Sequence, residues 1–279
     1  EIVLMTSSGL KTVAPPAPRM RICAFLWIYY GFPASSYENI NTEAVRYRCG
    51  EALAVRDKDL QVDAVAGVPD SGTAHALGYA VKADIPYRRS YVKYTPTWPR
   101  SFISVSKERR HVAQMKLLPI SEFIKGQRLL FCEDSIVRGT QLKDTFARLP
   151  EFGVKEVHVR SACPPILFTC KYLNFSPGRS NLDLIARRAV QTLEGDENKN
   201  LRQYTDSSTP QYAAMVKQIC KEMGFDSLKY QTLEDRNIFY LFSSVKDRYR
   251  SKIDRKSLLR IFLLTFCYSR KFDPSTRSK

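Results

Sequence analysis

The 279-residue chain lacks several features that would assign it to a class at once. A membrane-spanning helix needs ~20 apolar residues, but the longest apolar runs are Ile22–Tyr30 and Leu258–Tyr268, and Arg260 interrupts the second. The three His are not spaced like metal ligands. There is no Gly-Lys-Ser/Thr of a nucleoside-triphosphate loop. We therefore expect no membrane partner and no such nucleotide loop.

The cysteines and the first residues bear on the cellular compartment. The seven Cys are odd in number and are scattered without the framework of a small disulfide-rich domain. The chain opens with Glu1 and its first basic residue is Lys11, so we expect no signal peptide. These observations predict a cytoplasmic protein with reduced thiols.

Acidic residues are scarce: 28 Asp and Glu stand against 44 Lys and Arg, for a net charge of +16. Half of this excess lies in residues 239–279, which also contain no Ala, Gly or Glu. Such a composition is unusual for a folded protein. Residues 238–279 are therefore either a basic solvated tail with an amphipathic helix near Leu258–Phe266 or, as we favour, a disordered or out-of-frame segment. In neither case does the tail's charge indicate nucleic-acid binding.

The rest of the chain is of ordinary globular composition and alternates strand and helix patterns. We predict a strand at Ile2–Met5 and a proline-rich linker at 11–21. Apolar runs predict further strands at 62–68, 87–94, 128–133 and 154–160, with helices at 73–82 and 140–148. Nearly continuous apolar strands separated by helices favour a parallel sheet covered on both faces.

Ligands bind such sheets at the carboxyl ends of the strands. The loop Pro69–Thr73 offers backbone N–H groups to an anion, although an ordinary helix N-cap explains it equally simply. In the second loop, Glu133 and Asp134 are followed by Ser135–Gln141, whose backbone and Thr140 hydroxyl can hold a phosphate. Adjacent carboxylates suit sugar hydroxyls or a divalent cation instead. The predicted ligand is a phosphorylated sugar; two solvated acids would explain neither the loop nor its spacing.

Several motifs resemble one family. E-D-S-I-V-R-G-T at 133–140 resembles the phosphoribosyl pyrophosphate (PRPP) signature of type I phosphoribosyltransferases, in the form typical of amidophosphoribosyltransferases. V-P-D-S-G-T-A at 68–74 is similar to their diphosphate loop, and K-Y-T-P-T-W-P-R-S-F at 93–102 to the mobile loop of one branch. R-S-A-C-P-P-I at 160–166 and C-K-Y-L-N-F at 170–175 follow in the family's order. The resemblance implies an α/β type I phosphoribosyltransferase fold over 22–237, a doubly wound, mostly parallel sheet with a small hood.

The resemblance also implies an activity. The family transfers ammonia nitrogen to C1 of PRPP, which yields 5-phosphoribosylamine and diphosphate and begins purine synthesis. The ammonia comes from glutamine through an amino-terminal glutaminase domain, which we expect to be missing here apart from its end and a linker in residues 1–21. Homo-oligomers and purine-nucleotide regulators are implied as well. Arg109-Arg110 and Arg187-Arg188 are predicted to lie at the surface, where an anionic regulator could use them.

The family's site residues can be carried over position by position. Ser71, Glu133 and Asp134 are implied to hold Mg²⁺ or the ribose hydroxyls, with Glu133 standing where the usual pattern has Asp. Lys93 and Arg100 are implied to close over the diphosphate as catalytic residues. The implied PRPP-binding residues are Asp70, Ser71, Gly72, Glu133, Asp134, Ser135, Ile136, Val137, Arg138, Gly139, Thr140 and Gln141.

Two cysteines match ligands of a [4Fe–4S] cluster found in one branch of the family, Cys23 and Cys170. Such a cluster needs four thiolates, and the sequence contains no C-x-x-C to supply the other two. We therefore expect the cluster in the complete parent enzyme and an incomplete set here. The remaining cysteines before the tail are interpreted as core residues: Cys49, Cys132, Cys163 and Cys220.

Three alternative functions compete with a working transferase. A PRPP-sensing regulator on the same fold would need a separate DNA-binding domain and would not need the mobile loop. We find no such domain in this sequence, whereas the mobile-loop motif is present at 93–102. A catalytically dead fragment that still binds PRPP is favoured by the missing C-x-x-C and the atypical tail. A nucleic-acid-binding protein ranks last because half of the net charge lies in that tail.

Overall fold

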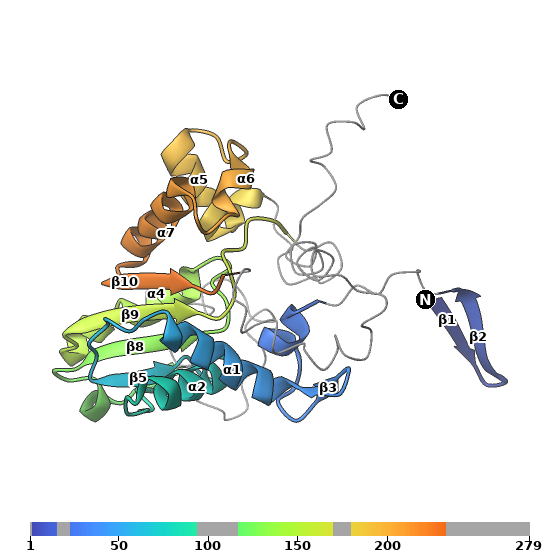
Figure 1. Cartoon of the computed structure of the whole chain (residues 1–279), viewed down its shortest axis with the longest axis horizontal. Coiled ribbons are helices and arrows are strands. Elements are labelled where there is room, and N and C mark those ends of the chain that lie inside the picture. The colour runs from blue at the N-terminus through green and yellow to red at the C-terminus, as the bar shows by residue number, and fades with distance from the viewer. Residues whose placement is uncertain (1, 16–22, 94–116, 170–179, 233–279) are drawn as a thin grey trace, which may run out of the picture.

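The computed structural model describes residues 2–15, 23–93, 117–169 and 180–232 (Figure 1). The strands are β1 (Ile2–Thr6), β2 (Gly9–Ala14), β3 (Ser36–Tyr37), β4 (Ile40–Asn41), β5 (Ala64–Gly67), β6 (Tyr91–Lys93), β7 (Leu117–Pro119), β8 (Arg128–Glu133), β9 (Glu156–Ser161) and β10 (Ser227–Tyr230). The α-helices are α1 (Thr42–Val55), α2 (Thr73–Ala83), α4 (Thr140–Phe146), α5 (Ile185–Glu194), α6 (Leu201–Tyr204) and α7 (Pro210–Met223). Short helices are η1 (Leu26–Tyr30, a π-helix), η2 (Ser121–Phe123), η3 (Leu149–Phe152) and η4 (Asn181–Asp183).

The main sheet has four parallel strands in the order β10-β9-β8-β5. On the side of β5 away from β8, Tyr87 forms a single parallel bridge with Val65. The chain thus leaves β5 toward one side, reaches Tyr87, and returns to β8 on the other. This reversal makes the sheet doubly wound, and it places the topological switch point between β5 and β8. The predicted α/β class is confirmed.

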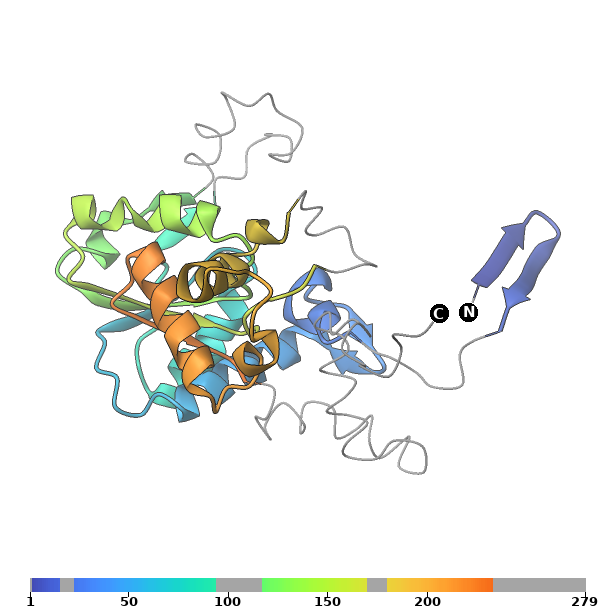
Figure 2. The same ribbon diagram turned by 90° about the horizontal axis from the view of Figure 1, so that it is seen from above.

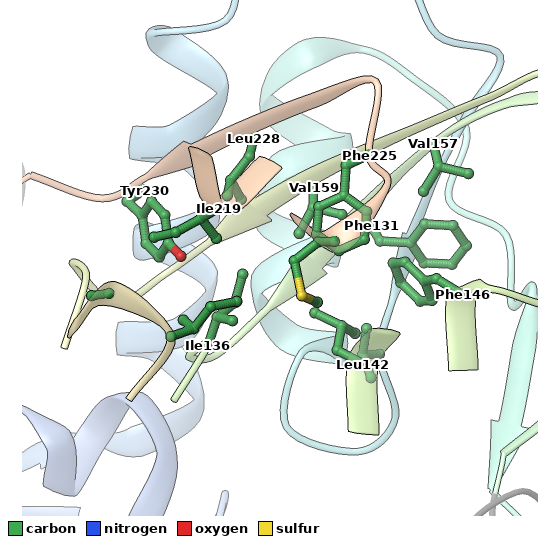
Figure 3. Close-up of a cluster of buried hydrophobic side chains, with 14 of the residues drawn as sticks. Phe131, Ile136, Leu142, Phe146, Val157, Val159, Ile219, Phe225, Leu228 and Tyr230 are labelled. Atoms are coloured by element: carbon green, nitrogen blue, oxygen red, sulfur yellow. The ribbon is translucent and has the colours of Figure 1, made fainter. Parts of the chain in front are cut away.

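Each face of the sheet is covered by its own helices, as the views in Figures 1 and 2 show. Val65, Leu130 and Cys132 belong to a buried cluster with α1 and α2. The alternating residues, such as Ala66 and Phe131, face a second cluster that includes α4, α5 and α7. Figure 3 shows part of that second cluster, with side chains from strands and helices interleaved. Burial on both faces explains why these strands are apolar at nearly every position.

Helices α1 and α2 pack closely because glycine stands at both contact points. A Cβ on Gly50 would lie 1.9 Å from the carbonyl oxygen of His75, and one on Gly78 would lie 1.9 Å from that of Tyr47. Any side chain at either position would push the helices apart. The start of α2 is therefore held directly against α1.

Two sequence predictions need correction. Residues 87–94 are predicted as one strand, but Tyr87 forms only an isolated bridge to the main sheet, Tyr91–Lys93 pairs antiparallel with β7, and residue 94 lies outside the described residues. The buried Tyr91 ring stacks on Phe146 and also contacts Phe131 of β8, so this segment packs on a face of the main sheet. The linker predicted at 11–21 begins too early, because residues 11–14 belong to β2, which pairs with β1.

The described part of the chain contains no helix that is both long enough and apolar enough to cross a membrane.

One ion pair joins Asp63, the residue before β5, to Arg128, the first residue of β8. The Asp63 carboxylate accepts hydrogen bonds from the Arg128 backbone N–H at 2.7 Å and from its Nη2 at 2.9 Å. These bonds lower the pKa of Asp63 from 3.8 to about 2. Because both side chains are about a third exposed, we expect a contribution of only about 0.5–1 kcal/mol.

Asp63→Asn is expected to be less stable than the wild type by that amount near neutral pH. The pKa is lower in the folded state, so the contribution is present above pH 3.8 and is lost as the pH falls toward about 2. Urea unfolding of both proteins over this range measures the difference. A difference that grows on acidification would contradict the assignment.

Candidate functional site

The loops that follow β5 and β8 lie side by side at the switch point. The Val68 backbone N–H donates to the Cys132 carbonyl oxygen at 3.0 Å. A Cβ on Gly72 would lie 2.3 Å from that same oxygen, so only glycine permits this approach. The two loops singled out in the sequence are thereby brought together. The peptide bond between Pro69 and Asp70 in the first loop is cis.

Serine hydroxyls from both loops meet at one carboxylate. Ser71 Oγ donates to Asp134 Oδ1 at 2.7 Å, and Ser135 Oγ donates to Asp134 Oδ2 at 2.7 Å. Asp134 is only 3% exposed. Because both oxygens are engaged, the orientation of this carboxylate is fixed before any ligand arrives.

Glu133 has a different environment from its neighbour. Its side chain is buried, and Oε2 has no hydrogen-bond partner among the described residues. Burial, reinforced by the negative charge of Asp134, raises the pKa of Glu133 well above its ordinary value of 4.5. The surroundings of Glu133 therefore disfavour its charged form, in contrast to the carboxylate of Asp134, which accepts two hydrogen bonds.

The ionisation of Glu133 can be tested through stability. Above pH 4.5 the unfolded chain releases this proton and the folded protein keeps it, which destabilises the fold by up to about 1.4 kcal/mol per pH unit. Glutamine cannot ionise, so the stability of Glu133→Gln relative to the wild type should rise as the pH increases from 4.5. Denaturant unfolding at several pH values measures this difference, and a constant difference would contradict a raised pKa of Glu133.

The start of each following helix is open to an anion. Neither α2, preceded by Gly72, nor α4, preceded by Gly139, has a side chain that caps its first N–H groups. Gly139 has a φ of +76°, and a Cβ there would lie 2.7 Å from Ile185 Cδ1. Uncapped helix N-termini bind phosphate groups through their backbone. Two such helix starts, at the same edge of the sheet, suit a ligand with more than one phosphate.

The remaining residues of the second loop divide into anchors and exposed positions. Ile136 is buried in the core, and the Val137 carbonyl oxygen accepts a bond from Ile185 N at 2.9 Å. Arg138 is exposed, with Nη2 3.7 Å from an Asp183 oxygen. Thr140 and Gln141 are exposed at the beginning of α4. The backbone is therefore fixed from below while the outer side remains accessible.

Lys93, at the end of β6, brings a positive charge to the first loop. Its Nζ lies 2.6 Å from Asp70 Oδ2, and both side chains are substantially exposed. An incoming diphosphate could compete with Asp70 for this cation. Arg100, which was predicted to act with Lys93, lies outside the described residues.

Two buried residues beneath the first loop were not singled out by the sequence. Arg46 lies on α1 and His75 on α2, and the negative charge of Asp134 acts on both. A single arginine or histidine in a helical segment carries no pattern that would distinguish it from a surface residue.

The predictions for cysteines and arginines have mixed outcomes. Cys49, Cys132 and Cys163 are buried, and the partly buried Cys220 packs against the core. Cys23 is partly buried, and Cys170 lies outside the described residues.

The surface location predicted for Arg187 is wrong. It is buried because its N–H groups find partners inside the protein, with Nε donating to the Leu167 carbonyl oxygen at 2.6 Å and Nη1 to that of Glu197 at 2.7 Å. Arg188 pairs with Glu222 at 2.9 Å, and 109–110 is not described.

The described residues contain no group of three or more His, Cys, Asp or Glu arranged around a metal. Mg²⁺, however, commonly binds through one or two carboxylates together with substrate phosphates and water. Asp134 and the Ser71 hydroxyl fit such a substrate-borne ion. The buried Glu133, whose charged form is disfavoured, fits direct ligation less well.

Similar proteins are found by sequence and by structure. No protein-family profile matches the chain. The chain is 35% identical over 192 residues to the chloroplastic amidophosphoribosyltransferase of Glycine max, covering 67% of this chain and 33% of that protein. It is 42% identical over 148 residues to the amidophosphoribosyltransferase of Pyrococcus horikoshii, covering 53% and 32%.

A solved structure is also similar. The glutamine PRPP amidotransferase from B. subtilis, complexed with ADP and GMP, matches with a TM-score of 0.65 and 28% identity, over 92% of this chain and 49% of that one. The chain thus spans about a third of the length of the curated relatives that it matches. By sequence and by fold, it is a homologue of the amidophosphoribosyltransferases, matched to their phosphoribosyltransferase portion.

Proposed function

We propose that residues 22–237 bind PRPP and transfer its phosphoribosyl group to ammonia, as the transferase part of an amidophosphoribosyltransferase. The observation that carries this proposal is the junction of two loops at one carboxylate. Ser71 from the β5 loop and Ser135 from the β8 loop both donate to Asp134, beside two uncapped helix starts. A sugar that carries phosphates at both ends matches this arrangement.

The ligand's parts can be assigned to the site by their chemistry. The 5′-phosphate takes the backbone of Ser135–Gln141, and the ribose hydroxyls take Asp134. The diphosphate takes the start of α2 and Lys93, which moves from Asp70. Mg²⁺, when bound with the substrate, neutralises part of the diphosphate charge. As the C1–diphosphate bond breaks, Lys93 stabilises the departing diphosphate and the nitrogen of ammonia forms the new bond to C1. The nitrogen then releases one proton to solvent, which leaves the neutral amine.

The wider setting is proposed from the relatives. In a complete enzyme, ammonia would come from glutamine, and the purine nucleotides in the B. subtilis structure favour nucleotide regulation of this chain as well. We further propose a cytoplasmic homo-oligomer. No [4Fe–4S] cluster is proposed for this chain, because Cys23 and Cys170 supply two of the four thiolates required.

The test is diphosphate release from PRPP with Mg²⁺, with either ammonia or glutamine as the nitrogen source, in the wild type and in Lys93→Ala. We expect release with ammonia alone, and slower release in the variant. Saturable PRPP binding without release would favour the alternative of a catalytically dead fragment. Absence of PRPP binding would contradict the proposed function.

A further inference from the structure

A buried arginine holds the end of a helix beneath the candidate site. Arg46 is 4% exposed. Its Nε donates to the Trp27 carbonyl oxygen at 2.9 Å, and its Nη2 donates to those of Tyr29 and Gly31 at 2.9 and 2.8 Å. No ion pair joins it to a carboxylate within the described ranges. These three hydrogen bonds all go to the carbonyl end of η1 and the residue that follows it.

This arrangement has a physical explanation. A buried guanidinium is costly unless its N–H groups are hydrogen-bonded. The last carbonyl groups of a helix lack helical partners and carry partial negative charge. Arg46 and η1 therefore satisfy each other, and replacing the arginine with an apolar residue leaves three carbonyl groups without this donor.

His75 holds the same helix end from α2. Its ring Nε2 lies 3.2 Å from the Ile28 carbonyl oxygen, and a carbonyl only accepts, so the proton is on Nε2. Burial lowers the pKa of His75 to about 4, and the ring is neutral near pH 7. Carbonyl groups within residues 27–31 are thus held by α1 and by α2 together.

These contacts extend to the ligand loops. His75 is the third residue of α2 and follows closely on Ser71 and Gly72. The missing Cβ of Gly50 lets α1 rest directly on the His75 backbone. The positive charge of Arg46 also interacts with the negative charge of Asp134. Arg46, η1 and the first turn of α2 therefore form one packed unit under the Ser71–Asp134 hydrogen bond.

We propose that Arg46 is a positioning residue for the PRPP site: by fixing η1 against the first turn of α2, it holds Ser71 in hydrogen-bonding distance of Asp134. The role in PRPP binding rests on the proposed function. The role of Arg46 in holding the loop after β5 does not rest on the proposed function, so one of these two roles can be contradicted without the other.

The test compares Arg46→Met and Arg46→Lys with a matched control, Arg187→Met. Arg187 is also 4% exposed, and it also donates to backbone carbonyl oxygens, those of Leu167 and Glu197. The dissociation constant for PRPP with Mg²⁺ is measured by calorimetry well below each variant's melting temperature. Hydrogen exchange of peptides covering residues 68–75 is followed without PRPP.

We expect Arg46→Met to weaken PRPP binding about tenfold, which is the effect of losing one hydrogen bond to a charged group, here that from Ser71 to Asp134. Hydrogen exchange in residues 68–75 should be faster than in the wild type. Arg46→Lys keeps the positive charge and can still donate to part of the carbonyl groups, so it should recover part of the PRPP affinity and part of the protection from exchange. Arg187→Met should lower the melting temperature with PRPP affinity and exchange in 68–75 near wild type. If Arg46→Met does not fold, Arg46→Lys tests the proposal in its place. We then expect weaker PRPP binding and faster exchange in residues 68–75 than in the wild type.

Two results would overturn the proposal: unchanged exchange and affinity in a folded Arg46 variant, or equal effects in Arg187→Met. If the wild type fails to bind PRPP, the proposed function is wrong. The exchange data alone then decide whether Arg46 holds the loop.

Discussion

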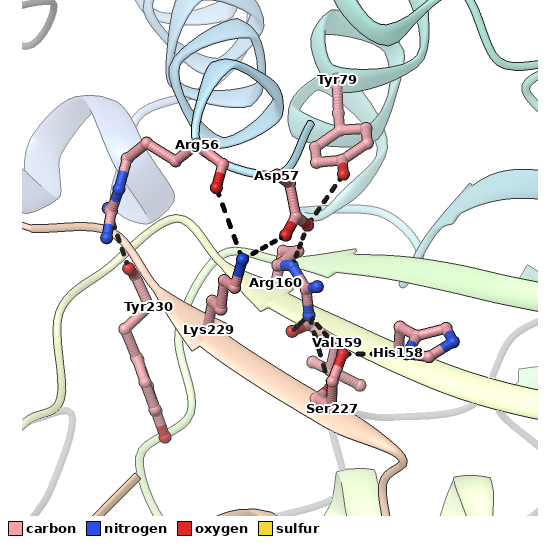
Figure 4. Close-up of polar contacts among 9 residues, drawn as sticks. All are labelled: Arg56, Asp57, Tyr79, His158, Val159, Arg160, Ser227, Lys229 and Tyr230. Atoms are coloured by element: carbon pink, nitrogen blue, oxygen red, sulfur yellow. Dashed lines mark hydrogen bonds and ion pairs between the residues drawn. The ribbon is translucent and has the colours of Figure 1, made fainter. Parts of the chain in front are cut away.

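Replacing Asp57 with alanine is expected to lower the free energy of unfolding by about 3–5 kcal/mol, the usual effect of leaving one member of a buried ion pair alone. The side chains of Asp57 and Arg160 are each 1% exposed. Asp57 accepts hydrogen bonds from Arg160, from Tyr79 at 2.9 Å and from Lys229 at 2.6 Å (Figure 4). Burial alone would raise the pKa of Asp57, but these donors lower it below 3.8, so the group is charged at neutral pH.

Chemical denaturation measures this loss, and Asp63→Ala is the matched control. Asp63 also pairs with an arginine but is about a third exposed, so we expect a loss of at most about 1 kcal/mol there. A double variant, Asp57→Leu with Arg160→Met, should lose less stability than Asp57→Ala because no unpaired charge stays buried. Equal losses in Asp57→Ala and Asp63→Ala would contradict the role assigned to burial.

Asp134→Asn is expected to weaken PRPP binding with Mg²⁺ on the order of 100-fold. A hydrogen bond to a charged group contributes about 1.5–3 kcal/mol, and about 1.4 kcal/mol corresponds to a tenfold change in affinity. Asparagine keeps the shape of Asp134 but removes the charge and one of the two oxygens that accept from Ser71 and Ser135.

The neighbouring acid supplies the comparison for this variant. Glu133→Gln changes the same functional group one residue away, but from a buried carboxyl group whose surroundings disfavour the charged form and raise its pKa. We therefore expect a much smaller loss of affinity, below about tenfold. Calorimetric titration of both variants, with melting curves to show that each is folded, makes the comparison. Similar losses in the two variants would contradict the different roles assigned to the two acids.

The centre of the fold could be predicted because its signals are local. Strand β8 matches the predicted Arg128–Glu133 at both ends, and β5 lies within the predicted 62–68. Both strands are buried on two faces, which leaves an apolar run in the sequence. Because ligand loops follow such strands, Ser71 and Asp134 could be predicted to lie at the same edge of the sheet.

The other parts of the fold could not be predicted, because they depend on contacts between distant parts of the chain. Strand β10 is the short segment S-L-K-Y, whose exposed Lys229 breaks the apolar pattern. Helix α1 buries the charged Arg46 and the polar Thr42, so its buried face is not uniformly apolar. Arg160 lies inside a buried strand only because Asp57, 103 residues earlier, accepts its hydrogen bond. No local pattern reveals such partners.

The Asp57 cluster also has a consequence for synthesis on the ribosome. Asp57 bonds to Lys229, 172 residues later, and Arg56 bonds to Gln231, 175 residues later. Contacts between such distant residues form late and slowly. Until residues 227–230 have left the exit tunnel, β9 is an open sheet edge able to pair with other nascent chains. Completion of β10 therefore covers the edge of β9 with a shorter strand that carries an exposed lysine, a feature that opposes pairing with other chains.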